Sequence, residues 1–93
     1  MSIVVRFAPE NLTAEKYDEA IRRHKVDGIE FPPDGMEYHV CFGTDGNLRV
    51  SEIWESREKL QAYGEKLMPL LADVGIKLSG EPEIFEAHNI VKR

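Results

Sequence analysis

Cysteine is nearly absent from this chain: Cys41 is the only one among 93 residues. A single thiol cannot form a disulfide within the chain, and one copy cannot build a metal site on cysteine ligands. Cys41 falls in the middle of an expected strand, where a small apolar residue packs well. We therefore interpret it as a core residue.

Long apolar segments and an excess of basic residues are also missing. No apolar run approaches the roughly 20 residues of a membrane-spanning helix, and no signal peptide is visible at the N-terminus, so we expect a cytoplasmic protein. The chain has 12 Lys and Arg against 17 Asp and Glu, a formal net charge of −5. Nucleic acids and anionic membranes bind clustered positive charge, so neither is an expected partner.

Motifs that hold cofactors or metals are not found. No Gly-x-Gly-x-x-Gly pattern occurs, which disfavours a flavin or a nucleotide. His39, Glu52 and His88 are residue types that bind metals, but no ligand spacing supports such a site. Ser51 and Ser56 lack the context of a nucleophile. We predict no cofactor and no metal.

The residues that are present predict one α+β domain over residues 1–93. Hydrophobic residues make up 42% of the chain, enough for a core. Helical and alternating periodicities give the elements. They are a strand at 2–8, a helix from the N-cap Thr13 to Gly28, strands at 36–43 and 48–55, a helix from the N-cap Ser56 to Gly75, and a strand at 83–91.

Three positions interrupt these patterns. Pro69 should kink or restart the second helix, because proline lacks the backbone donor and clashes with the preceding turn. Gly64 costs about 1 kcal/mol relative to Ala inside a helix, so it marks either close packing or room for a ligand. The loop at 31–35 contains two prolines and a glycine. It forms either the rim of a cavity or a rigid turn.

Asp45-Gly46 predicts a two-residue hairpin turn of type I′. That turn pairs His39 with Glu52 and Cys41 with Val50. One face of the hairpin then carries His39, Cys41, Leu48, Val50, Glu52 and Trp54, and the other carries Tyr38, Val40, Phe42, Arg49, Ser51 and Ile53. Both faces hold bulky apolar groups, although two helices cover only one, so we predict a homodimer.

The order strand-helix-strand-strand-helix-strand predicts a ferredoxin-like fold. Two right-handed crossovers give a four-stranded antiparallel sheet with both helices on one face. With Trp54 near the end of the third strand in the run 51–56, and a helix starting at Ser56, nearly the whole chain resembles the dimeric α/β-barrel superfamily. The antibiotic-biosynthesis-monooxygenase-like domains are the most similar group.

This resemblance implies a ligand pocket between the sheet and its own helices, faced by His39, Glu52 and Trp54. The superfamily includes cofactor-free oxygenases, haem-degrading enzymes, isomerases and proteins without an assigned activity. Haem-degrading members use an axial histidine on the second helix. Residues 57–74 contain no histidine, which disfavours haem.

His39 and Glu52 are the predicted catalytic residues. A carboxylate beside an imidazole fixes its tautomer and raises its basicity, as a general base requires. The alternative is a half-buried pair that satisfies itself across the strands. Trp54 offers a flat wall for an aromatic substrate, or else it packs in the core under the second helix.

Four further residues are predicted to contact the substrate: His88, Tyr63, Met68 and Tyr17. His88 lies in the last predicted strand, either in the pocket or at the rim of a dimer. The other three lie on helices, where core packing is the alternative to ligand contact.

Two classes of function remain open. The first is a cofactor-free monooxygenase or isomerase that acts on an aromatic or polyketide-like small molecule. The second is a non-catalytic binding domain or a structural dimer. An enclosed cavity of several hundred Å³ with His39 on its wall is typical of the first class or of a binder, whereas a packed interior indicates a structural role.

Overall fold

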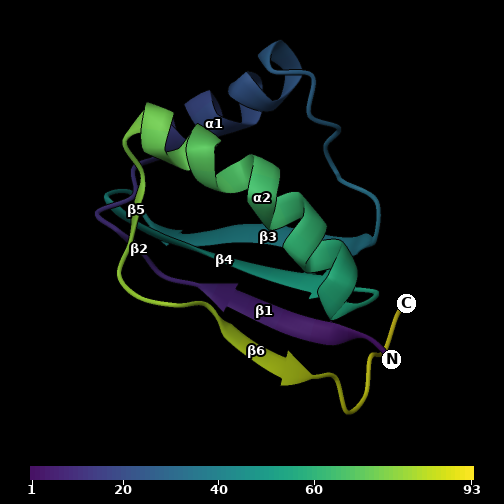
Figure 1. Cartoon of the computed structure of the whole chain (residues 1–93). Coiled ribbons are helices and arrows are strands. Elements are labelled where there is room, and N and C mark those ends of the chain that lie inside the picture. Colours follow the sequence, from purple (N-terminus) through teal and green to yellow (C-terminus); the bar gives the residue numbers. More distant parts are fainter.

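Four strands and two helices build the body of the molecule, and two short strands form a separate ladder (Figure 1). The computed structural model describes residues 1–93. The elements are β1 (Ile3–Phe7), β2 (Pro9–Glu10), α1 (Ala14–Val26), β3 (Met36–Thr44), β4 (Asn47–Trp54), α2 (Arg57–Val74), β5 (Lys77–Leu78) and β6 (Glu83–Glu86).

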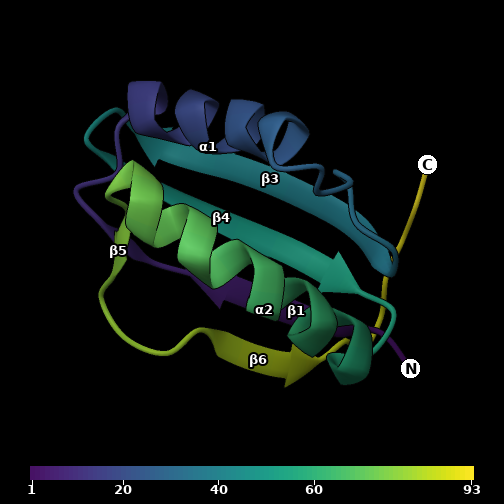
Figure 2. The same cartoon turned by 45° about the horizontal axis from the view of Figure 1, so that its top comes forward.

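The main sheet has the order β3-β4-β1-β6, and all its neighbouring strands are antiparallel. Both helices lie on one face of it (Figures 1 and 2). The predicted ferredoxin-like α+β fold is therefore confirmed. Neither helix is both long and apolar enough to cross a membrane.

Both predicted N-cap residues make capping hydrogen bonds at the start of their helices. Thr13 Oγ1 accepts from the backbone N–H of Lys16 at 3.1 Å, and Ser56 Oγ accepts from that of Lys59 at 3.2 Å. These hydroxyls satisfy backbone donors that have no partner inside the helix. Gly75 ends α2 with a φ of 83°, a left-handed conformation that glycine adopts without a steric penalty.

The structure decides one alternative in the second half of the chain and corrects one strand. Of the two outcomes expected at Pro69, a restart is excluded, because α2 runs without a break from Arg57 to Val74. The last strand ends at Glu86 rather than Val91. The only strand next to β6 is β1. Glu86 pairs with Ile3, the first residue of β1, so β6 has no partner strand beyond Glu86.

The β3–β4 hairpin has the predicted register from residue 38 to the turn. His39 pairs with Glu52, and Cys41 pairs with Val50. The turn itself is not type I′, because Gly46 has a positive φ of 90° and Asp45 does not. The Asp45 carboxylate instead accepts from the backbone N–H of Ala14 at 2.8 Å, at the start of α1.

The core lies between the sheet and α2. Its centre is formed by Ile3, Val5, Trp54 and Tyr63, all of them buried. The opposite face of the sheet has no covering element in the chain (Figure 1). An apolar row of four paired residues crosses all four strands on that face: Tyr38, Ile53, Val4 and Phe85. Tyr38 and Phe85 are 54% and 53% exposed.

Candidate functional site

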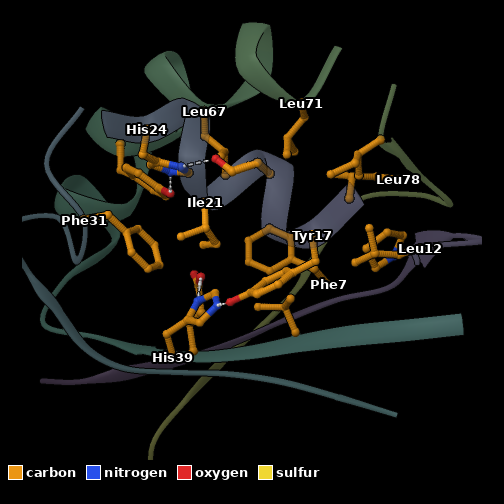
Figure 3. Close-up of a pocket in the computed structure, with 16 residues that line it drawn as sticks. Phe7, Leu12, Tyr17, Ile21, His24, Phe31, His39, Leu67, Leu71 and Leu78 are labelled. Carbon is orange, nitrogen blue, oxygen red and sulfur yellow. Dashed lines mark hydrogen bonds and ion pairs between the residues drawn. The ribbon is translucent and has the colours of Figure 1, made fainter. Parts of the chain in front are cut away.

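A cavity of about 70 Å³ lies between the helices and the sheet. Sixteen residues line it, twelve of them hydrophobic (Figure 3). Five lining side chains carry polar atoms: Tyr17, His24, His39, Glu52 and Tyr63. They come from α1, β3, β4 and α2, so only the complete fold brings them together.

One group of polar side chains, Tyr17, His39, Glu52 and Trp54, forms a continuous hydrogen-bonded chain that we call the sheet-side cluster. Tyr17 Oη lies 2.7 Å from His39 Nε2, and His39 Nδ1 lies 2.7 Å from Glu52 Oε2. The indole N–H of Trp54 donates to Glu52 Oε1 at 2.8 Å. Both carboxylate oxygens of Glu52, which is 4% exposed, therefore have a hydrogen-bond partner.

The hydrogen-bond pattern assigns the protons of this cluster. A carboxylate only accepts, so His39 Nδ1 donates to Glu52, and when the imidazole is neutral this is its one ring proton. His39 Nε2 is then an acceptor, and the Tyr17 hydroxyl donates to it. Burial raises the pKa of Tyr17 to about 12, with smaller contributions from the charges of Cys41 and Glu52, so the phenol keeps its proton near neutral pH.

A second group, which we call the helix-side cluster, consists of His24, Tyr63 and the carbonyl of Ala20. His24 Nδ1 lies 2.7 Å from the Ala20 carbonyl oxygen, and His24 Nε2 lies 2.6 Å from Tyr63 Oη. By the same reasoning, Nδ1 donates to the carbonyl and Tyr63 donates to neutral His24. Both side chains are buried, and this burial raises the pKa of Tyr63.

Phe31 lies between the two clusters. Its ring centroid is 4.9 Å from that of His24 and 5.2 Å from that of His39. Figure 3 shows His24 on the helix side, His39 on the sheet side and Phe31 beside the space between them. The loop that carries Phe31 therefore contributes to the cavity wall, which favours the cavity-rim interpretation of residues 31–35.

The structure brings some of the predicted site residues together and separates others. Tyr17, His39, Glu52 and Tyr63 all line the cavity. Trp54 does not: it is fully buried, with its ring centroid 5.5 Å from that of Tyr63. Of the two alternatives for Trp54, the structure therefore favours core packing under α2.

Met68 and His88 also lie away from the cavity. Met68 is 52% exposed on α2 and borders a separate groove. His88 is exposed in the segment after β6, because the strand that was predicted to hold it ends at Glu86. The three residues weighed for a metal site, His39, Glu52 and His88, therefore do not converge.

Among the cavity residues that are not predicted site residues, His24 and Phe31 are the two whose rings pack within or between the clusters. His24 follows Tyr17 by seven residues, two helical turns, so the same face of α1 carries both. This spacing is a signal that could have identified His24. Phe31 lies in an irregular loop, where no periodicity indicates which way a side chain points.

The accessible wall of the cavity is almost entirely apolar, and the polar atoms of both clusters lie behind it. Each tyrosine hydroxyl donates its proton to an imidazole, so its oxygen keeps only lone pairs as acceptors. On the sheet side, a proton accepted by Tyr17 Oη can pass to His39, whose positive charge would lie beside Glu52.

Sequence comparisons find no match for this chain, either to a protein-family model or to a curated protein. Structural similarity extends over nearly the whole chain. SnoaB, a cofactor-independent oxygenase from Streptomyces nogalater, is 13% identical, with a TM-score of 0.61 over 99% of this chain and 96% of that one.

Two further structures are described provisionally as antibiotic biosynthesis monooxygenases. The protein from Chloroflexus aurantiacus is 16% identical, with a TM-score of 0.59 over 98% of this chain and 95% of that one. The protein from Deinococcus radiodurans is 13% identical, with a TM-score of 0.57 over 100% and 98%. At these identities the similarity establishes the fold. The chain therefore has the fold of the antibiotic-biosynthesis-monooxygenase-like proteins, as the sequence resemblance implied.

Proposed function

We propose that this protein is a cofactor-free enzyme that removes a proton from an aromatic or polyketide-like small molecule. The observation that carries the proposal is the unbroken hydrogen-bonded chain from Tyr17 through His39 to Glu52 at the wall of an apolar cavity. The shared fold with a cofactor-independent oxygenase supports it.

The proton transfer follows from the assigned hydrogen bonds. The ligand hydroxyl donates to Tyr17 Oη, and Tyr17 passes its own proton to His39 Nε2. The imidazolium is stabilised by the Glu52 carboxylate, 2.7 Å away. In this scheme Tyr17 contacts the ligand, and His39 acts through Tyr17. Because both protons move together, no free tyrosinate is needed.

Loss of the proton leaves an electron-rich anion, and two reactions are open to it. In a monooxygenation the anion itself reduces O₂: one oxygen atom converts a ring CH₂ group into a carbonyl, and the other leaves as water. In an isomerisation the proton returns at a different carbon. Neither reaction needs an organic cofactor, because the substrate supplies the electrons.

The test uses dihydroxyanthrone, an oxidisable aromatic with phenolic hydroxyls, in aerated buffer without added cofactor. We expect the protein to accelerate O₂ uptake with one carbonyl formed per O₂ consumed. His39→Gln should lower the rate by about 10²-fold, whereas His88→Gln, the same change at an exposed position, should leave it unchanged. Equal rates for His39→Gln and the unaltered protein would contradict the proposal.

A non-catalytic binding protein is the second candidate. One observation favours it over catalysis: every buried polar side-chain atom already has a hydrogen-bond partner within the chain, so none of them is left unpaired for a reacting group. A binder would take up naphthol without consuming O₂ or changing it chemically. Calorimetry together with product analysis separates the two candidates.

We further propose that the protein forms a homodimer through the uncovered face of the sheet. The apolar row Tyr38, Ile53, Val4 and Phe85 is the basis, since a two-fold axis would bury this row against its own copy. Light scattering at micromolar concentration should give the dimer mass, and Phe85→Glu should shift it toward the monomer. A monomeric mass for the unaltered protein would contradict this.

A further inference from the structure

Charged residues flank the apolar row on the uncovered face of the sheet. Strand alternation places Val4 and Arg6 on this face of β1. The Ala87 N–H donates to the Ser2 carbonyl at 3.0 Å and so continues the β1–β6 ladder to Ser2, which shares the face. Ser2 and Arg6 therefore stand on opposite sides of the row, each about 7 Å from Val4 along the strand.

The Ser2 end of this face is negative. Glu37 lies at the irregularity of β3 between Met36 and Tyr38, where a bulge can re-aim a side chain. The Ser2 hydroxyl donates to the Glu37 carboxylate, whose two oxygens lie 3.1 and 3.0 Å away. Glu37 is exposed and forms no ion pair within the chain. Its charge is thus held in place at Ser2 without a cation to balance it.

The opposite end of the face carries two arginines, Arg6 on β1 and Arg49 on β4. Both are exposed, and both line a hollow of about 160 Å³. Neither forms an ion pair within the chain. Glu83 lies directly across from Arg6 on β6, yet these two side chains do not pair either. The guanidinium donors of Arg6 therefore stay available to a carboxylate from outside the chain.

A two-fold axis that packs this face against its own copy can run in two directions. An axis along the strands brings the same ends of the two copies together, so Arg6 and Arg49 of both copies gather around it and repel one another. An axis across the strands, parallel to the apolar row, reverses the strand direction. It places Arg6 of each copy over the Ser2 end of the other, at the sheet separation of about 10 Å that side chains span.

We propose that the two-fold axis runs across the strands, along the apolar row, and that Arg6 of each copy forms an ion pair with Glu37 of the partner subunit. This inference rests on the homodimer proposed above, and it adds the direction of the axis and the two charged contacts that select it. The apolar row supplies buried area, which either axis could provide. The charges at its two sides favour only one of them.

The first experiment measures the dissociation constant of the dimer by analytical ultracentrifugation for two charge reversals, Arg6→Glu and Glu37→Arg. Each variant places like charges at both contacts, so its constant should rise at least about 10-fold. Arg49→Glu is the matched control, with the same change of net charge as Arg6→Glu on the same face. Arg49 is four residues from Ile53 in the row, so its image falls beyond the end of β4, and the constant should stay within about 3-fold.

The second experiment mixes the two reversed chains. The Arg6→Glu chain carries carboxylates at both positions, and the Glu37→Arg chain carries a cation at both. A heterodimer of the two regains both contacts, so it should form with a dissociation constant within about 3-fold of that of the unaltered dimer. Native mass spectrometry identifies the heterodimer. Pairing within one chain cannot produce this result, because neither variant chain contains both charges.

Two results would overturn the inference while the homodimer stands: a heterodimer no tighter than the two variant homodimers, or an Arg6→Glu dimer tighter than the unaltered one, as an axis along the strands requires. A monomeric mass for the unaltered protein would instead overturn the homodimer itself. If circular dichroism shows that Arg6→Glu fails to fold, Arg6→Gln and Arg49→Gln repeat the comparison. Arg6→Gln alone should then weaken the dimer, by at least about 3-fold.

Discussion

The sheet-side and helix-side clusters contain the same pair of side chains in the same orientation, yet they differ in what holds the imidazole. In each, a tyrosine hydroxyl donates to histidine Nε2. His39 Nδ1 faces the Glu52 carboxylate, whereas His24 Nδ1 faces the neutral carbonyl of Ala20. Only His39 has a full negative charge next to it.

In the proposed reaction, this difference separates a proton acceptor from a fixed structural group. A histidine that takes up a proton in a buried site needs a partner for its positive charge. Glu52 provides one for His39, and nothing equivalent faces His24. We infer that the helix-side cluster holds its hydroxyl in position, whereas the sheet-side cluster is the one suited to the proposed proton transfer.

Glu52→Gln gives the largest predicted effect, because it removes the negative charge that distinguishes the sheet-side cluster from the helix-side cluster. The glutamine amide would donate to His39 Nδ1, so the ring proton moves to Nε2 and His39 no longer accepts from Tyr17. Turnover of dihydroxyanthrone should fall by at least about 10³-fold. Nitrogen NMR of the imidazole should report the tautomer change. An unchanged tautomer with full activity would contradict the assignment of the protons.

Trp54→Phe tests how the carboxylate is held. The indole N–H is one of two donors to Glu52, and the side chain is fully buried. Losing this hydrogen bond and leaving a small void should lower the free energy of unfolding by about 2–3 kcal/mol. Urea denaturation measures it. A loss below about 0.5 kcal/mol would show that Glu52 needs no second donor.

Removing the hydroxyl from each cluster in turn sharpens the comparison. Tyr63→Phe leaves His24 Nε2 buried without a partner, at a cost of about 1–2 kcal/mol. The His39 side chain is 17% exposed, so water can replace the lost partner, and Tyr17→Phe should cost less than about 1 kcal/mol. The difference in unfolding free energy between the two variants is the measurement, and a reversed order would contradict the burial argument.

Alkaline pH gives the smallest effect. The pKa of Tyr17 is raised from 10.0 to about 12, so the folded protein holds this proton more tightly than the unfolded chain. The resulting stability is fully present below pH 10 and is lost as pH rises toward 12. Tyr17→Phe should therefore flatten the decline in stability over this range, measured by urea denaturation. A slope equal to that of the unaltered protein would contradict the raised pKa.

The sequence predicts the sheet-side cluster well because its central contact is local. A two-residue turn fixes which residues pair, and strand alternation then places His39 and Glu52 on one face. The contact between His24 and Tyr63 joins two helices whose relative position no local pattern specifies. Strand alternation also places Trp54 on the correct face, but its depth depends on how α2 packs against the sheet.

Two other differences between the expected and the observed structure arise from contacts with residues that are distant in the sequence. The turn at Asp45 departs from type I′ where its carboxylate bonds to Ala14, thirty-one residues earlier. His88 leaves the sheet because β1, the partner of β6, begins only at Ile3. Such effects depend on the assembled structure rather than on the residues nearby.

The bond between Asp45 and Ala14 has a consequence for how the proton-transfer groups are arranged. It joins the tip of the hairpin to the start of α1, and the Leu48 N–H adds a second tie to the Leu12 carbonyl at 3.0 Å. The strands that carry His39 and Glu52 are thereby fastened to the helix that carries Tyr17. In the proposed reaction, the three groups would therefore already be in place when a ligand arrives, and proton transfer would need no rearrangement of the backbone.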